Sequence, residues 1–328
     1  MNPQIVPSSG RQLSRAGFQG LPAIIERAGE KASRRFLEFF LAAIRNKNTR
    51  LAYARAVRDF LTWCEQRGIH ELARIDSFTV AAYVEHLGSQ RSAPTVKQHL
   101  AAIRMLFDYL VTGQVDGMPF NPAAAVRGPR HVVKRGKTPV LKPEEARQLL
   151  DSIDCSSLSG LRDRALLGVM VYSFARVGAV VAMRVEDYYQ QGKRWWLRLH
   201  EKGGKRHEVP AHHNAEAYLD AYLDAVGIRD EKKTPLFRAI SQRRQLTENR
   251  MNRVDVFRMI KRRCRAADIS MTTNCHTFRA TGITAYLLNG GTIENAQAIA
   301  AHESPRTTKL YDRTSDEITL DEVERIAI

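Results

Sequence analysis

The chain has 328 residues, which is long enough for two domains that each bury a core of their own. Its 51 lysine and arginine residues outnumber its 35 acidic ones, and the formal net charge of +16 favours a polyanionic partner, nucleic acid before a membrane surface. The sequence shows neither an apolar run that could span a bilayer nor the basic and apolar regions of a signal peptide. We therefore expect a soluble, cytoplasmic protein with no membrane partner.

A compact helical domain is expected over residues 31–117, after an N-terminal extension of residues 1–30. Apolar side chains recur at helical spacing in four segments, residues 32–44, 51–64, 80–87 and 96–110. The last three segments follow residues that cap or open helices, namely Asn48 or Thr49, Asp76 with Ser77, and Pro94. Gly68, Gly88 and Gly113 end them. This pattern predicts a four-helix unit.

Residues 118–142 are expected to form a basic linker between two domains. Prolines interrupt this part of the chain, helical periodicity is almost absent, and basic side chains are frequent: Arg127, Arg130, Lys134, Arg135 and Lys137. These charges either keep a tether in solvent or contact the phosphates of a bound nucleic acid. We favour the second interpretation.

The last part of the chain, residues 143–328, has a mixed pattern that is mostly helical. Helices are expected at residues 143–150 and 161–174, and a β-hairpin at residues 194–200 and 206–210 with a glycine-containing turn. A further helix is expected at residues 247–267, with one apolar face: Met251, Val254, Phe257, Ile260 and Cys264. Its basic face serves either DNA contact or solubility. The tail, residues 320–326, has helical spacing and packs either on its own domain or on a neighbouring protomer.

A short stretch near the C-terminus gathers groups that suit the attack on a phosphodiester. It contains His276, Arg279, His302 and Tyr311. A phenol with an ordinary pKa near 10 is a poor nucleophile at neutral pH, so it needs cationic groups that hold the phosphate and acid–base groups that move its proton. A guanidinium can bind two phosphate oxygens, and an imidazole exchanges protons near neutrality. Taken singly, either histidine could be an ordinary capping or buried polar residue.

No metal site or cofactor is expected. The two histidines are far apart, and no carboxylate cluster accompanies them. The four cysteines have no Cys-x-x-Cys spacing, which argues against disulfides and zinc: Cys64, Cys155, Cys264 and Cys275.

Two further basic residues complete the candidate set. Arg176 follows a long apolar helical pattern, where its side chain must find a partner or a ligand, although a single arginine in so basic a chain is weak evidence. Lys202 lies in the turn of the expected hairpin, and Lys205 is its competitor. Tyr172 and Tyr286 are rivals of Tyr311 as the nucleophile.

With the order Arg176, Lys202, His276-x-x-Arg279, His302 and Tyr311, the chain resembles the tyrosine recombinase, or phage integrase, family in its simple Xer-like bacterial form. The resemblance covers the chain beyond its first few dozen residues. It implies a mainly α-helical, two-domain clamp around DNA, with an N-terminal four-helix core-binding (SAM-like) domain. The C-terminal domain would be a mixed α/β catalytic domain with a small β-hairpin sheet.

The resemblance also implies the chemistry. Arg176 and Arg279 would hold the scissile phosphate, His276 and His302 would assist in roles left open, Lys202 would protonate the leaving oxygen, and Tyr311 would attack. A 3′-phosphotyrosyl linkage and a Holliday junction would follow, on specific double-stranded DNA sites and in a homotetramer with a dimer per site. Accessory proteins are possible. Relaxation of DNA by a type IB topoisomerase and a non-catalytic DNA-binding regulator of the same fold are the alternatives.

Two departures from the family pattern stand out. Many similar proteins carry a carboxylate shortly after the first arginine, whereas this chain has Gly178 and Ala179 there. We expect Glu186 or Asp187 to take over part of that bracing role, or no residue to do so. The residues before His302 are Ala300 and Ala301 where leucine and glycine are usual, which affects local packing alone.

Overall fold

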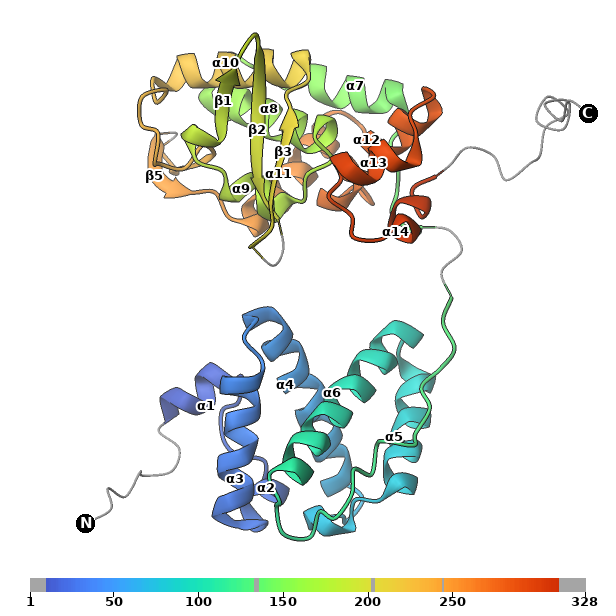
Figure 1. Ribbon diagram of the computed structural model, residues 1–328. Helices are drawn as coiled ribbons and strands as arrows, with labels where there is room; N and C mark the ends of the chain where they lie inside the picture. The colour runs from blue at the N-terminus through green and yellow to red at the C-terminus, as the bar shows by residue number, and fades with distance from the viewer. Residues whose placement is uncertain (1–9, 133–135, 202–203, 244, 313–328) are drawn as a thin grey trace, which may run out of the picture. The chain divides into compact units, whose positions relative to one another are not determined.

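The computed structural model describes residues 10–132, 136–201, 204–243 and 245–312. The chain divides into two compact units, with the boundary between Val132 and Val133 (Figure 1). Each unit has its own hydrophobic core. In the described residues, no helix is both long enough and apolar enough to cross a membrane.

The N-terminal unit is helical throughout. Its elements are α1 (Gly10–Ala16), α2 (Ala23–Arg27), α3 (Gly29–Glu38), a π-helical turn (Phe39–Ala43), α4 (Lys47–Glu65), a 3₁₀ turn (Leu72–Arg74), α5 (Ser77–Gln90) and α6 (Ala93–Thr112). The four expected helices are therefore present. Asp76 caps α5 by accepting a hydrogen bond from the backbone N–H of Thr79 at 2.8 Å. The cap of α4 is Asn46, which accepts from the N–H groups of Asn48 and Thr49.

Residues 10–30 are part of this unit's core. Phe18, from the segment between α1 and α2, packs edge-on against Phe36 and Phe40, with ring centroids 5.0 Å apart in each case. Ile24 and Ile25 of α2 are fully buried in the same cluster. The segment expected to be an extension thus supplies buried side chains to the N-terminal unit.

The C-terminal unit combines helices with two small sheets. Its elements are α7 (Pro143–Asp151), α8 (Leu158–Tyr172), α9 (Val177–Ala182), a 3₁₀ turn (Val185–Asp187), β1 (Tyr188–Gln191), β2 (Arg194–His200), β3 (Arg206–Pro210), α10 (His213–Val226), β4 (Arg238–Ile240), β5 (Leu246–Arg250), α11 (Arg253–Ala266), α12 (Cys275–Leu288), α13 (Ile293–Ile299) and α14 (Pro305–Lys309). Helix α8 is its centre, because it is apolar on most sides and packs against α10 and α12.

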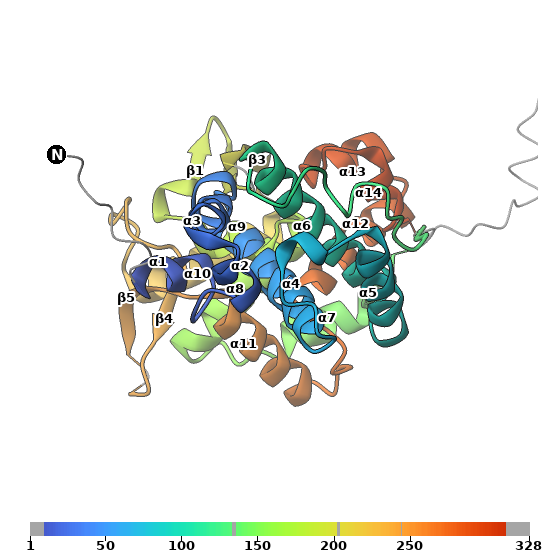
Figure 2. The same cartoon turned by 90° about the horizontal axis from the view of Figure 1, so that it is seen from below.

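The three-stranded sheet is antiparallel, in the order β1-β2-β3. In the register of the expected hairpin, Leu197 faces Val209, and both are buried. The second sheet, β4 and β5, is a two-stranded hairpin at the end of the unit opposite α13 and α14 (Figures 1 and 2). The sequence predicted the first hairpin but not β1 or the second sheet.

The expected helix at residues 247–267 begins later than predicted. Its first residues form β5, and α11 starts at Arg253 after Asn252, which caps it by accepting from two backbone N–H groups. The buried face is also shifted: Val256 and Met259 are buried, whereas Val254 and Phe257, which were expected in the core, are about half exposed. Met251, which was expected on this helix, is buried but lies in the connection between β5 and α11. The helix therefore starts at a different residue and buries a different face.

Candidate active site

Helix α12 positions two of the predicted residues, His276 and Arg279. Asn274 caps this helix: its side chain accepts from the N–H of His276 at 2.9 Å, and its own N–H donates to the Thr277 hydroxyl at 3.1 Å. The cap fixes where the first turn begins. Because residues three apart lie on one face of a helix, His276 and Arg279 then point in the same direction.

Arg279 is buried, with 1% of its surface exposed. One terminal nitrogen donates to the carbonyl oxygen of Phe174 and the other to that of Ala300, the latter at 2.6 Å. Phe174 has a φ of 54°, and Ala301, which follows Ala300, has a φ of 49°. Such left-handed conformations cost a non-glycine residue about 1–2 kcal/mol. The backbone is therefore strained at Phe174, which supplies one of these carbonyls, and at Ala301, the residue after the one that supplies the other.

The guanidinium of Arg279 retains donors for a ligand. Its Nε–H is buried and makes no hydrogen bond of good geometry among the described residues, although the Tyr311 hydroxyl is close enough to the guanidinium to act on its pKa. A buried donor without an acceptor costs about 1–3 kcal/mol, which an anionic ligand would recover. Burial and then the nearby charge of Arg176 lower the pKa of Arg279 to about 10. The side chain therefore stays protonated at neutral pH and keeps its charge for an anion.

Tyr311 lies two residues after the end of α14, and its hydroxyl is 3.1 Å from Nε2 of His276. The side chain is 7% exposed. The hydroxyl of Thr284 in α12 donates to the backbone carbonyl of Tyr311 at 2.8 Å, which fastens the residue to the same helix that carries His276. The expected short helix does begin at Ser304–Pro305.

His302 lies against the tyrosine ring. The two rings are nearly parallel, at 9°, with centroids 5.8 Å apart. Nδ1 of His302 forms a 3.0 Å hydrogen bond with the Thr308 hydroxyl, and both side chains are buried. Burial, followed by the charges of Arg279 and Arg176, lowers the pKa of His302 to about 3. The ring is therefore neutral at physiological pH.

Arg176 precedes α9 and is held by Glu201, the residue that follows β2. Its Nη1 donates to Oε2 of Glu201 at 2.6 Å, and the carboxylate is almost completely buried. The expectation that Glu186 or Asp187 braces Arg176 is wrong. Asp187 accepts from the backbone N–H of Arg184, and Glu186 pairs with the Arg184 side chain. No local sequence signal distinguishes Glu201, because its partner lies 25 positions earlier.

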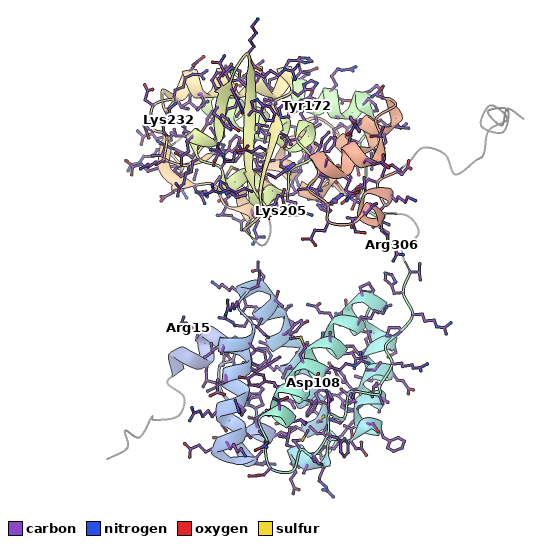
Figure 3. The ribbon with its side chains drawn as sticks, in the orientation of Figure 1. Arg15, Asp108, Tyr172, Lys205, Lys232 and Arg306 are labelled. Atoms are coloured by element: carbon purple, nitrogen blue, oxygen red, sulfur yellow. The ribbon has the colours of Figure 1, made fainter. Side chains whose placement is uncertain are left out.

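Lys202 lies outside the described residues, so its position is still a prediction. Lys205, its competitor, is exposed just before β3 and lines a hollow of about 350 Å³ together with His302. Lys205 and Arg306 of α14 lie at the same edge of the unit (Figure 3). His207 in β3 donates from Nε2 to the carbonyl oxygen of Ile299 at 2.9 Å. This bond ties the hairpin to the end of α13, three residues before His302.

The rival tyrosines have other surroundings. Tyr172 stacks on His212, with centroids 4.1 Å apart, and its hydroxyl accepts from the side chain of Asn214. Tyr286 packs edge-on against Phe174. Across the described ranges, no three histidine, cysteine or acidic side chains gather in a way that could hold a metal ion. The predicted tail helix, residues 320–326, falls outside the described residues.

The comparison with known families agrees with this geometry. Residues 139–317 match the phage integrase family, and residues 34–114 match the phage integrase N-terminal SAM-like domain. The chain belongs to the phage integrase family. It is a tyrosine recombinase by that membership, with the mainly helical fold, the SAM-like first domain and the catalytic second domain that the sequence predicted.

Named relatives cover most of this recombinase. It is 26% identical to tyrosine recombinase XerD of Listeria monocytogenes serotype 4b over 269 residues, which are 80% of this chain and 87% of the relative. It is 29% identical to tyrosine recombinase XerC of Chlamydia muridarum over 237 residues, 71% of this chain and 70% of that one.

Solved structures show the same fold at low sequence identity. The XerH site-specific recombinase in a post-cleavage complex with a palindromic difH substrate has a TM-score of 0.68 at 16% identity, and the match covers 99% of this chain and 90% of that one. A lambda integrase dimer bound to a COC′ core site has a TM-score of 0.65 at 18% identity, with coverages of 88% and 79%.

Proposed function

We propose that this tyrosine recombinase cleaves and rejoins specific DNA sites with Tyr311 as its nucleophile. The observation that carries the proposal is the 3.1 Å contact between the Tyr311 hydroxyl and Nε2 of His276, next to a buried arginine with a free donor. The phenol oxygen attacks the scissile phosphorus, the bond from phosphorus to the 5′ oxygen breaks, and a 3′-phosphotyrosyl linkage forms. The phosphotyrosyl linkage conserves the energy of the cleaved phosphodiester bond for the rejoining step. Neither nucleotide hydrolysis nor a metal ion therefore enters this scheme.

His276 is assigned to the proton of the phenol. A general base must lie within hydrogen-bond reach of the proton that it accepts, and Nε2 of His276 meets that condition. Burial, and then the charges of Arg279 and Arg176, lower the pKa of this histidine. A neutral imidazole can accept a proton, so the lowered pKa supports the assignment at neutral pH.

Arg176 and Arg279 are assigned to the phosphate. Phosphoryl transfer depends on positioning and on donors that are already oriented toward the charge of the transition state. Arg279 is fixed by two carbonyls and keeps its Nε–H free, while Arg176 is fixed by Glu201 and keeps 38% of its side chain exposed. His302, neutral and stacked on the tyrosine ring, donates one further hydrogen bond to a phosphate oxygen.

Lys202 is assigned to the leaving 5′ oxygen, on the strength of its place in the family pattern. An ammonium group in a hairpin turn can deliver a proton to an alkoxide as it forms. Lys205, at the other side of the same turn, is the alternative donor and lines the hollow that His302 also lines. Replacing each lysine separately distinguishes them.

Double-stranded DNA is the proposed partner, and a tetramer on two sites the proposed assembly. The net charge of +16 supports a polyanionic partner. A lambda integrase structure of the same fold is a tetramer bound to a Holliday junction, with a TM-score of 0.65 at 18% identity. In our proposal the C-terminal residues 320–326 pack on a neighbouring protomer and link cleavage to assembly.

Covalent capture tests the proposal. The protein is incubated with sheared genomic DNA from its source organism, the protein-linked fragments are recovered under denaturing conditions, and the linked strand ends are sequenced. We expect one recurrent sequence, called here the captured site. Tyr311→Phe should bind that site and yield no adduct, and an adduct that persists in this variant would refute the assignment.

Assays on the captured site then distinguish the candidate activities. A nicked suicide substrate built on the captured site traps the adduct, which a non-catalytic DNA-binding regulator would not form. Exchange of strands between two captured sites identifies recombination. Relaxation of supercoiled DNA without strand exchange would instead identify a type IB topoisomerase.

A further inference from the structure

Glu201 occupies an unusual position for a charged residue. It directly follows β2, 7% of its surface is exposed, and its carboxylate accepts the 2.6 Å hydrogen bond from Nη1 of Arg176. A carboxylate this deeply buried is costly unless it is paired. Among the described residues it is the one acidic side chain that pairs with Arg176. Without Arg176, the Glu201 carboxylate would be buried and unpaired. Without Glu201, the Arg176 side chain would lose the group that restrains it.

The backbone of Glu201 is fixed as well. Its N–H donates to the carbonyl oxygen of Lys205 at 2.8 Å, which closes the base of the turn between β2 and β3. The next pair along the two strands, His200 and Arg206, is in register. The carboxylate therefore reaches Arg176 from a rigid strand end, and α9, whose first residue follows Arg176, packs against β2.

We infer that Glu201 is the positioning residue of Arg176. This inference rests on the proposed function. One N–H of the guanidinium is fixed by the carboxylate, and the exposed remainder of the group is left to face the phosphate. Glu201 also offsets the repulsion between Arg176 and Arg279 while no phosphate is bound, since its charge acts on both guanidinium groups.

Removal of the Glu201 charge should affect DNA affinity and the rate of cleavage differently. Removing the charge of Glu201 makes the cluster more positive by one unit, so its attraction for a phosphate is unchanged or stronger. Removing the same charge frees the Arg176 side chain to adopt other directions. A displacement of about 1 Å in a catalytic group costs on the order of 10²-fold in rate. Cleavage should therefore fall while DNA affinity does not.

The decisive comparison is Glu201→Gln against Glu208→Gln. Glu208 lies on β3 of the same hairpin and pairs with Arg198 at 2.7 Å, but it is exposed, and Arg198 is not among the proposed catalytic residues. Each variant removes one negative charge from one carboxylate–arginine pair. On a suicide substrate built on the captured site, we expect Glu201→Gln to form the Tyr311 adduct about 10- to 100-fold more slowly at equal affinity. Glu208→Gln should match the wild type.

The same Glu201→Gln substitution in an Arg176→Lys variant shows whether Glu201 acts through Arg176. In Arg176→Lys, which retains the charge but loses the fork of donors, adding Glu201→Gln should slow the adduct less than about twofold, because there is no guanidinium left to orient. Equal losses in both backgrounds would overturn the inference, and so would equal rates for Glu201→Gln and Glu208→Gln. If the wild type formed no adduct at all, the proposed function would fail first and this inference with it. Glu201→Asp covers the case in which the amide variant does not fold.

Discussion

Nε2 of His276 lies 3.1 Å from the hydroxyl of Tyr311, although the two residues are 35 positions apart. Both are fastened to α12: His276 belongs to its first turn, and the backbone carbonyl of Tyr311 accepts from Thr284 on the same helix. Acid and base are thus held by one rigid element, and the contact does not depend on how the two units of the chain are arranged.

The pH dependence of cleavage should follow from that contact. Burial and the charges of Arg279 and Arg176 lower the pKa of His276 from its ordinary value of about 6.5. Its neutral form accepts the phenol proton, so the rate should stay level as pH falls to about 6.5 and decline only below it. His276→Gln should be slower by about 10²–10⁴-fold and lack the acidic decline. Single-turnover adduct formation at a series of pH values measures both, and an identical acidic decline in the variant would contradict the assignment.

His302 should make the C-terminal unit sensitive to acid. Its pKa is lowered to about 3 in the folded chain, against about 6.5 in an unfolded one. Below pH 6.5 the unfolded chain therefore binds a proton that the folded one does not. The free energy of unfolding should fall by up to about 1.4 kcal/mol for each pH unit between 6.5 and 3.

The dependence of the free energy of unfolding on pH is measured by urea unfolding, with hydrogen exchange at α12 as the probe. We expect His302→Gln to reduce it, whereas His70→Gln, at an exposed position of the N-terminal unit, should leave it unchanged. A wild-type slope in His302→Gln would show that other groups cause the acid sensitivity.

Arg279→Lys should lose both stability and activity. The two terminal nitrogens of Arg279 donate to the carbonyl oxygens of Phe174 and Ala300, and a lysine ammonium has no planar fork that spans both. At least one buried carbonyl would lack a donor, so the free energy of unfolding should decrease by about 1–3 kcal/mol. Adduct formation on the captured site should fall with it. Arg265→Lys, at an exposed position of α11, is the control and should change neither.

Gly282→Ala tests the close packing of α12 on the C-terminal end of α8. A Cβ at Gly282 would lie 2.1 Å from the carbonyl oxygen of Val171 and 2.7 Å from the Phe174 ring. The helices must separate, which should cost about 1–3 kcal/mol and shift the carbonyl that holds Arg279. Gly88→Ala in α5 meets open space and should be neutral or stabilising by up to about 1 kcal/mol. Thermal unfolding and adduct rates compare the two; equal effects would refute this account of the packing.

Local patterns predicted the elements that depend on neighbouring residues. The hairpin of β2 and β3 has the bounds expected from the sequence, because alternating apolar residues and a glycine-containing turn are sufficient to define it. The four helices expected over residues 31–117 were predicted for the same reason, whereas α1 and α2 of the same unit were not predicted. The strands β4 and β5 were missed, since β5 is polar and mostly exposed and lacks a clear alternation.

The sequence indicated candidate residues of the site but not the contacts between them. The spacing of His276, Arg279, His302 and Tyr311 indicated the cluster because it matches a family pattern. Glu201 was not singled out, since an ion pair across 25 positions is decided by how α9 packs on β2 and leaves no periodic trace in the sequence. The strained carbonyl at Phe174 was likewise invisible, because an apolar residue gives no sign of a left-handed backbone.

The contact between His276 and Tyr311 also determines what a mixture of protein copies can do. The proposed nucleophile, its proposed base and the guanidinium of Arg279 lie together within one chain, so each copy carries these three groups itself. Two inactive variants, Tyr311→Phe and Arg279→Ala, would therefore not rescue one another when combined, because no composite centre could be assembled from halves contributed by different copies. An enzyme that borrowed its tyrosine from a neighbour would regain activity in the same mixture.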